Sequence, residues 1–183
     1  EGDFSDYDII VIPDQDIVSL KNGLGNPYPN DYQGGLGKQG LDHLKRFAEK
    51  GGTLLFLGNA TALPLLEWDF QARNVISGLP REKFDIPGSL LRVMVNNRHP
   101  LGYGMTSEAA VMFKSNPSFN LSEGLSIATY PNKDLLLSGW AVGEEILSAK
   151  VGLAELRLGK GRLILIGFRS HFRAQTRATY KFL

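Results

Sequence analysis

Residues 34–58 read GGLGKQGLDHLKRFAEKGGTLLFLG, and this stretch predicts a loop, an amphipathic helix, a tight turn and a buried strand. Within the helix, Asp42 and Arg46 are four residues apart on the polar side, where they are expected to pair. Gly51-Gly52 can adopt the positive φ that ends a helix without a Cβ penalty. Thr53 to Leu57 is apolar without alternation, as in a strand covered on both faces. The apolar face of the helix comprises Leu41, Leu44, Phe47 and Ala48.

Two further apolar runs complete the predicted core of the sheet. Tyr7 to Pro13 precedes the helix and should lie parallel to Thr53–Leu57, joined to it by a right-handed crossover. Arg162 to Phe168 is the third run. Because all three runs are continuously apolar, we expect three central strands of one sheet, each buried on both faces.

The remaining sequence predicts shorter elements. Residues 22–37 are rich in glycine and proline and read as a long loop. The turn at Gly159-Lys160-Gly161 predicts a hairpin, and Ala174 begins a final helix. Short strands are expected over 89–96, 109–113, 125–130, 135–140 and 151–158, and short helices over 63–70 and 143–150. The expected fold class is α/β, with three layers, a mostly parallel central sheet and an antiparallel strand extension.

Composition indicates an ordinary globular domain spanning residues 1–183. The 183 residues are 43% hydrophobic and 21% charged, enough for one domain with a sizeable core. A net charge of +1 gives no bulk attraction to nucleic acid, and no apolar run approaches the length of a membrane span. We therefore expect neither a nucleic-acid partner nor a membrane span. The sequence begins at Glu1 without an initiator Met, and we expect it to be excised from a longer chain.

The chain contains no cysteine, which excludes disulfides, thiolate metal sites and a cysteine nucleophile. The three histidines, His43, His99 and His171, have no paired spacing typical of a zinc site. We therefore expect no metal and no other cofactor in this part of the protein.

The segment Gly58-Asn59-Ala60-Thr61 follows a strand and precedes a short helix, which is the setting of a nucleophile elbow. The amide of Asn59 is not a useful nucleophile, and no nearby histidine follows to activate the Thr61 hydroxyl. We expect Thr61 to cap the helix that follows, and we assign no catalytic residue.

Polar side chains also follow the first and the last core strands. Asp14 and Gln15 come after the first, and Arg169, His171 and Arg173 after the last. Because ligands bind at the carboxyl ends of parallel strands, these residues with Asn59 and Thr61 form a candidate pocket for a small anion or carboxylate. The alternative is a structural network in which the basic groups bond loop carbonyls and acids such as Asp14.

Several segments together resemble the C-terminal domain of bacterial zinc carboxypeptidases of the carboxypeptidase A type, a domain with a class I glutamine amidotransferase-like fold. The segments are Tyr32–Gly37, Phe47–Leu54, Pro87–Ser89, His99–Met105, Leu137–Trp140, Gly167–Arg169 and Arg173–Thr176. The resemblance runs over nearly the whole chain. It implies that zinc and its ligands belong to an N-terminal peptidase domain that this sequence does not include.

The resemblance also implies the partner and the compartment. The expected partner is the peptidase domain of the same chain, in a parent protein that is secreted or periplasmic. Active amidotransferases carry Cys at the elbow, where this sequence has Gly58 or Asn59. The expected function is therefore a non-catalytic accessory domain for structural support, substrate positioning or oligomerisation, with a homo-oligomer as a further partner. The alternatives are a small-ligand sensor, or a cysteine-independent hydrolase using the pocket near Asn59 and His171.

Overall fold

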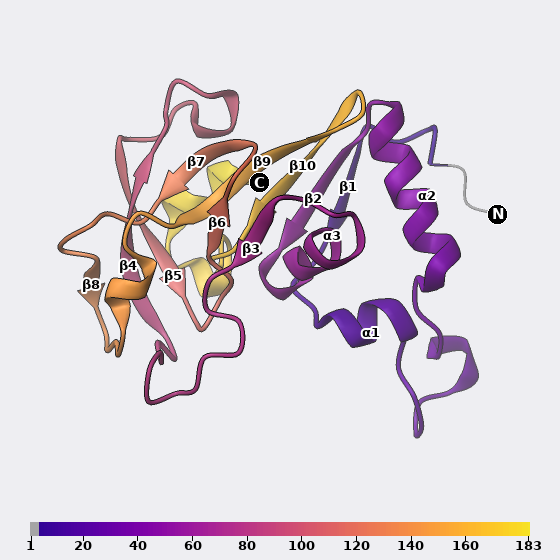
Figure 1. Ribbon diagram of the computed structural model, residues 1–183, viewed down its shortest axis with the longest axis horizontal. Helices are drawn as coiled ribbons and strands as arrows, with labels where there is room; N and C mark the ends of the chain where they lie inside the picture. Colours follow the sequence, from indigo (N-terminus) through magenta and orange to yellow (C-terminus); the bar gives the residue numbers. More distant parts are fainter. Residues whose placement is uncertain (1–3) are drawn as a thin grey trace.

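The computed structural model describes residues 4–183 and has an α/β fold with a parallel core and an antiparallel extension (Figure 1). The main path of the sheet runs β1-β2-β10-β9-β7-β4-β5. Its strands are β1 (Ile9–Ile12), β2 (Thr53–Leu57), β3 (Ala72–Asn74), β4 (Ser89–Val95), β5 (Glu108–Phe113), β6 (Phe119–Leu121), β7 (Leu125–Thr129), β8 (Leu136–Ser138), β9 (Val151–Leu158) and β10 (Gly161–Ile166). The helices are α1 (Ile17–Asn22), α2 (Gly37–Lys50) and α3 (Ala62–Glu67), with 3₁₀ turns η1 (Asn30–Tyr32), η2 (Gly58–Thr61), η3 (Pro100–Gly102), η4 (Glu144–Leu147), η5 (Phe172–Ala174) and η6 (Arg177–Phe182).

The parallel core consists of β1, β2 and β10, with β2 in the middle. Ile9 and Arg162 both lie opposite Thr53, so the three strands start level with one another. Their carboxyl ends therefore meet at one edge, which brings Asp14, η2 and Arg169 together.

Helix α2 confirms the predicted amphipathic pattern. Its buried residues are Leu41, Leu44, Phe47 and Ala48, and Gly51 ends the helix with a φ of 128°. The expected Asp42–Arg46 pair is wrong, because Asp42 pairs with Lys38 at 3.0 Å on the preceding turn. Both spacings put the two charges on one face of the helix, so the sequence alone did not decide between the partners.

The expectation of three central strands is right for two of them. Every residue of β2 is buried, and β10 is buried except at Arg162. Strand β1 is an edge strand, with the side chains of Ile9 56% and Val11 50% exposed. A continuous apolar run therefore correctly predicted burial of both faces for β2 and β10. For β1 the same pattern was misleading, because only one face of this strand is covered.

The antiparallel extension begins at the β9–β10 hairpin, as predicted. Its turn lies against the end of α2, where the Lys160 N–H donates to the Glu49 carbonyl at 3.0 Å. Gly159 has a φ of 59°, and a Cβ there would lie 2.6 Å from the same carbonyl. The turn therefore needs glycine for both its conformation and its packing.

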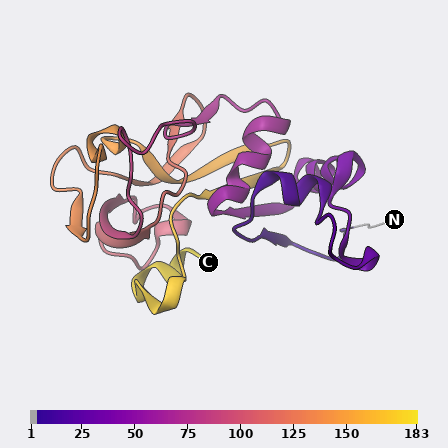
Figure 2. The ribbon, with the colours of Figure 1, turned by 90° about the horizontal axis from the view of Figure 1, so that it is seen from below.

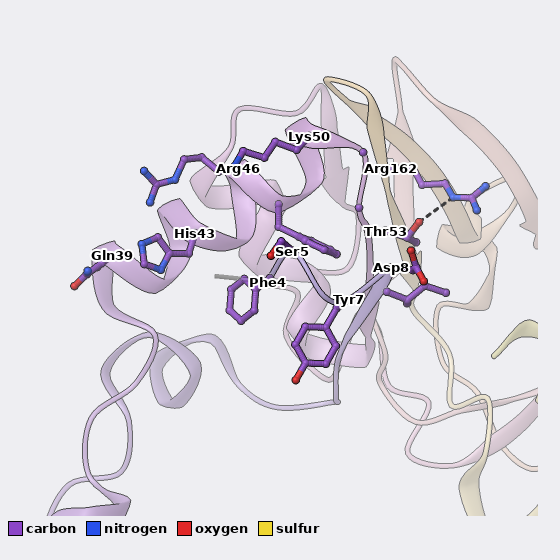
Figure 3. A pocket seen from close by; sticks show the side chains of 14 residues that line it. Phe4, Ser5, Tyr7, Asp8, Gln39, His43, Arg46, Lys50, Thr53 and Arg162 are labelled. Carbon is purple, nitrogen blue, oxygen red and sulfur yellow. Dashed lines mark hydrogen bonds between the residues drawn. The ribbon is translucent and has the colours of Figure 1, made fainter. Parts of the chain in front are cut away.

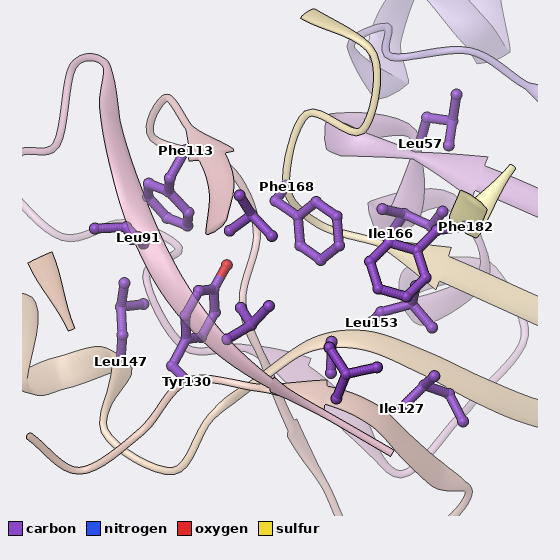
Figure 4. Packing of buried hydrophobic residues seen from close by; sticks show 14 of the residues in the cluster. Leu57, Leu91, Phe113, Ile127, Tyr130, Leu147, Leu153, Ile166, Phe168 and Phe182 are labelled. Carbon is purple, nitrogen blue, oxygen red and sulfur yellow. The ribbon is translucent and has the colours of Figure 1, made fainter. Parts of the chain in front are cut away.

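Two hydrophobic clusters cover the two faces of β2 and β10. On one face, Leu54, Phe56, Leu163 and Leu165 pack with residues of α2 and α3. On the other, alternate residues of the same strands join a cluster with the antiparallel strands and η6, drawn in Figure 4. This second cluster includes Leu55, Leu57, Ile164, Ile166, Phe113, Tyr130, Phe168 and Phe182.

Several short elements differ from their expected form. Helix α1 falls in a segment that the sequence did not mark as helical, and Asp16 caps it by accepting the Ser19 N–H at 2.9 Å. The expected helices at 143–150 and from Ala174 are 3₁₀ turns. Ala149, with a φ of 55°, and Ala174, with a φ of 58°, interrupt the helical backbone there.

Candidate functional site

Asp14, Asn59 and Arg169 meet at the carboxyl ends of the three parallel strands. The backbone N–H of Asn59 donates to Asp14 Oδ1 at 2.9 Å. Arg169 Nη2 lies 3.2 Å from Asp14 Oδ2. Both carboxylate oxygens of Asp14 are therefore engaged by the protein itself, and the charge of Arg169 is balanced before any ligand arrives.

The elbow between β2 and α3 keeps a backbone conformation typical of nucleophile elbows. Gly58 has a φ of 53°, in the left-handed region that favours glycine. A Cβ at this position would lie 2.3 Å from Cγ of Asp14. The space into which an elbow nucleophile would project is therefore filled by the Asp14 carboxylate.

Thr61 is fully buried beneath this elbow. Its Oγ1 donates to the Gly58 carbonyl at 2.7 Å. No side-chain hydrogen bond caps the N-terminus of α3, so the expectation that Thr61 caps this helix is wrong. The hydroxyl satisfies a carbonyl inside η2 and does not face solvent.

The other residues of the candidate pocket make different contacts. The Arg173 guanidinium lies 5.4 Å from the centroid of the Phe172 ring, and the Arg169 guanidinium 5.3 Å from it. His171 Nδ1 lies 3.2 Å from the Ser170 hydroxyl. Within residues 4–183, no hydrogen bond or ion pair joins Gln15, His171 or Arg173 to Asp14 or Asn59. The structure thus brings three of the seven candidate residues into one network.

A groove of about 900 Å³ lies at the opposite edge of the sheet, where the parallel strands begin (Figure 3). The candidate pocket predicted from the sequence lies at the carboxyl ends of the strands, so this groove was not among the predicted sites. Its signal was the run of basic residues on the polar side of α2, spaced three to four residues apart. The lining includes Phe4, Tyr7, His43, Arg46, Lys50 and Arg162.

Glu155 on β9 is a second feature that the sequence analysis missed. Its side chain is 1% exposed, and neither carboxylate oxygen has a hydrogen-bond partner in residues 4–183. Arg157 Nη2 lies 3.4 Å and Arg162 Nη1 3.7 Å from the carboxylate, with His99 Nε2 at 3.8 Å. His99 Nδ1 accepts the Leu101 N–H at 3.3 Å, which leaves Nε2 as the ring nitrogen that faces Glu155. The available signal was a lone glutamate within the otherwise apolar residues 151–156.

Among the described residues, no group of three or more His, Asp or Glu side chains is placed to hold a metal ion. In the same part of the chain, no helix is long and apolar enough to cross a membrane.

Comparison with known proteins gives structural similarity alone. No protein-family model matches the chain, and no curated protein is significantly similar to it. Two cytoplasmic proteins from Salmonella typhimurium align with a TM-score of 0.57 over 97% of this chain, at 14% and 12% identity. The aligned parts cover 69% and 67% of those two proteins.

The chain also aligns with part of a larger enzyme, the β-galactosidase from Bacillus circulans sp. alkalophilus. The alignment covers all of this chain, with a TM-score of 0.54 and 11% identity. It covers 22% of the β-galactosidase, so the chain spans about a fifth of the length of that protein. None of the neighbours described here is a carboxypeptidase. At these identities the alignments establish the fold, which is of the class I glutamine amidotransferase-like type.

Proposed function

We propose that this domain is a non-catalytic accessory domain of a longer protein. The observation that carries the proposal is the filled elbow. A covalent nucleophile there needs a side chain that a neighbouring base can deprotonate. Gly58 has none, and the Asp14 carboxylate lies 2.3 Å from where its Cβ would be. The elbow therefore serves to join β2 to α3.

The charge balance at the strand ends favours the same role. Arg169 is paired with Asp14 at 3.2 Å. An incoming carboxylate would have to compete with this pair for the guanidinium. The match to about a fifth of a β-galactosidase chain agrees with a domain that occurs within longer proteins.

The parent protein in this proposal is a bacterial zinc metallocarboxypeptidase of the carboxypeptidase A type. This part rests on the sequence segments that resemble the C-terminal domain of that family. The zinc and the catalytic residues would belong to the peptidase domain. The present domain would support it structurally, position its substrates or mediate oligomerisation.

Activity assays on the 183-residue chain test the non-catalytic role. We expect no hydrolysis of glutamine or of peptides with a free C-terminus. Turnover that disappears in Thr61→Val or His171→Ala would overturn the proposal, because Thr61 lies beneath the elbow and His171 belongs to the candidate pocket predicted from the sequence. Val18→Ala, on the exposed surface of α1, is the matched control.

The parentage is tested separately by determining the sequence that precedes Glu1 in the native protein. A zinc peptidase domain with a His-x-x-Glu pair is the expected finding. Another kind of domain there would reject the carboxypeptidase parent and leave the accessory role to be judged by the assays.

A sensor of small anions is the second candidate. It is favoured by Arg169 Nε, which is buried and has no hydrogen-bond partner within residues 4–183. Thermal shift with acetate, citrate and phosphate tests it. Stabilisation that is lost in Arg169→Gln, without any turnover, would favour the sensor over the scaffold.

A further inference from the structure

The groove at the starting ends of the parallel strands carries an excess of positive charge. Three cationic side chains line it, Arg46 and Lys50 from α2 and Arg162 from β10. Asp8, just before β1, is the one acidic residue of the lining within the part of the chain that the structure describes. With His43 neutral, two positive charges remain in excess. This charge balance favours an anion as the occupant of the groove.

Two of these cations are available to a ligand. Arg46 and Lys50 have no ion-pair partner within residues 4–183. Both are exposed and lie four residues apart on α2, so their charged groups lie on the same face of the helix. A single anionic group can therefore contact both side chains.

Arg162, the third cation, is positioned by contacts on the sheet. Its Nε donates to the Thr53 hydroxyl at 3.2 Å, and its Nη1 lies 3.7 Å from the Glu155 carboxylate (Figure 3). Arg157 lies closer to the same carboxylate, at 3.4 Å. Because Arg157 offsets the charge of Glu155, the charge of Arg162 still contributes to the excess in the groove.

The end of α2 is the feature of the groove that opposes an anion. The last carbonyls of a helix carry partial negative charge and normally disfavour an anion. Here the carbonyls of Phe47, Ala48 and Glu49 each accept a backbone N–H from the turn that follows or from the β9–β10 hairpin. Lys50 adds a positive charge to the last turn. The side-chain cations therefore set the sign of the potential in the groove.

Aromatic side chains form the apolar part of the same groove. Phe47 is buried, and its ring lies so close to the backbone of Gly52 that a Cβ there would be 2.3 Å from it. Phe4 packs edge to face against Phe47, with the ring centroids 6.2 Å apart. Tyr7 is exposed, and Figure 3 shows Phe4 and Tyr7 between the side chains of α2 and those of the sheet. Such rings pack well against a planar ring of a ligand.

We propose that this groove binds a small phosphate monoester that carries an aromatic ring. The charge of a phosphate monoester, about −1.5 to −2 at pH 7, matches the excess of the lining. Arg46, Lys50 and Arg162 contact the phosphate through charge-assisted hydrogen bonds, and Phe4 and Tyr7 contact the ring. The volume of about 900 Å³ is in the range of small-molecule sites.

This site is separate from the Asp14–Arg169 pair and from the proposed accessory role. The groove lies where the parallel strands begin, and the pair lies where they end. Figure 2 shows α2 and the start of the indigo strand β1 at one end of the molecule, with the yellow C-terminal segment away from them. Binding in the groove can therefore be tested whatever the role of the elbow.

NMR titration of the 183-residue chain with phenyl phosphate, AMP, inorganic phosphate and adenosine tests the inference. We expect phenyl phosphate or AMP to bind about tenfold or more tightly than inorganic phosphate and adenosine, with the largest amide shifts at Gly51, Gly52 and Thr53. Tighter binding of AMP would indicate a nucleotide as the ligand, and tighter binding of phenyl phosphate a simpler aryl ester. Binding of neither ester, or inorganic phosphate binding as tightly as both, would overturn the inference.

Charge variants locate the phosphate. Arg46→Gln and Lys50→Gln should each weaken binding of the better ester by about tenfold, since each removes one charge-assisted contact. Lys45→Gln is the matched control, because it changes the same charge on α2 outside the groove. Arg169→Gln should also leave the affinity unchanged. Unchanged affinity in both groove variants, or a loss in Arg169→Gln, would overturn the inference.

Tyr7→Ala tests the contact with the aromatic ring. It should weaken binding of the better ester and leave the affinity for inorganic phosphate unchanged, because Tyr7 contacts only the ring. Circular dichroism checks that each variant is folded. Equal affinities of Tyr7→Ala and the parent chain for the ester would reject the aromatic part of the site.

Discussion

Gly58 has the backbone conformation of a nucleophile elbow but no side chain that could act as the nucleophile. Its φ of 53° gives the sharp elbow, while the Asp14 carboxylate occupies the space of a side chain. The elbow and its lack of a nucleophile could be predicted from the sequence. That Asp14 fills the elbow could not, because the two residues are far apart in the sequence and no local pattern connects them.

Replacing Gly58 by Ala should destabilise the domain by about 2–4 kcal/mol, combining left-handed strain with overpacking against Asp14. Gly78→Ala is the control, with a φ of 74° and no atom within 4 Å of an added Cβ. It should cost about 1 kcal/mol, from backbone strain alone. Chemical denaturation of both variants measures the difference. Equal losses would mean that Asp14 does not fill the elbow.

Asp16, which caps α1, leads to a prediction about how the stability of the domain depends on pH. The backbone N–H of Ser19 donates to its carboxylate and lowers the pKa of Asp16 below its ordinary value. A lowered pKa contributes stability above the unfolded-state value, and this contribution is lost as pH falls through the folded-state value. Asp16→Ala should therefore be less stable than the parent near neutral pH, with the gap narrowing below about pH 4.

Thermal unfolding across this pH range checks the prediction. Asp6→Ala, at an exposed residue, is the control and should show no such gap. A gap for Asp16→Ala that stays constant with pH would contradict the role of the ionised cap.

At the scale of elements, β1 and β2 have similar sequences but different surroundings. IIVI and TLLFL are both apolar without alternation, yet β2 is buried on both faces and β1 on one. Burial depends on which strand lies at the end of the sheet, and that order is set by β10, more than a hundred residues further along. The short run of β1 carries no information about its own position.

Leu55 tests the central place of β2. Leu55→Asp should prevent folding, because an unpaired carboxylate in this fully covered strand costs several kcal/mol, against a total stability on the order of 5–15 kcal/mol. Leu66→Asp is the control, since Leu66 is 70% exposed on α3 and should tolerate the change. Cooperative melting of a soluble Leu55→Asp protein would contradict the assignment.

For the molecule as a whole, the sequence predicted the α/β class because helix and strand periodicities are local. Local patterns predicted the amphipathic helix α2, its end at Gly51 and the β9–β10 hairpin. Contacts between elements that are distant in the sequence could not be predicted in this way. The Arg169–Asp14 pair and the cluster around Glu155 each join residues from different parts of the chain, so only the folded structure reveals them.

We predict that the purified domain holds no stoichiometric zinc. The chain has no cysteine and its three histidines have no paired spacing, so a site would need distant ligands to converge. Elemental analysis before and after treatment with a chelator is the measurement. One equivalent of zinc that survives purification would refute the prediction and would require a site built from separate segments.

The place of β10 beside β2 in the parallel core has a consequence for biosynthesis. Strand β2 gains its second neighbour only through residues such as Arg162, which lies 109 positions after Thr53. On the ribosome, β1, α2 and β2 can form early, but one long edge of β2 stays bare until β10 has emerged. The central sheet is therefore completed only after more than a hundred further residues have been synthesised, and until then the strand that is fully buried in the fold is open to chaperones and to aggregation.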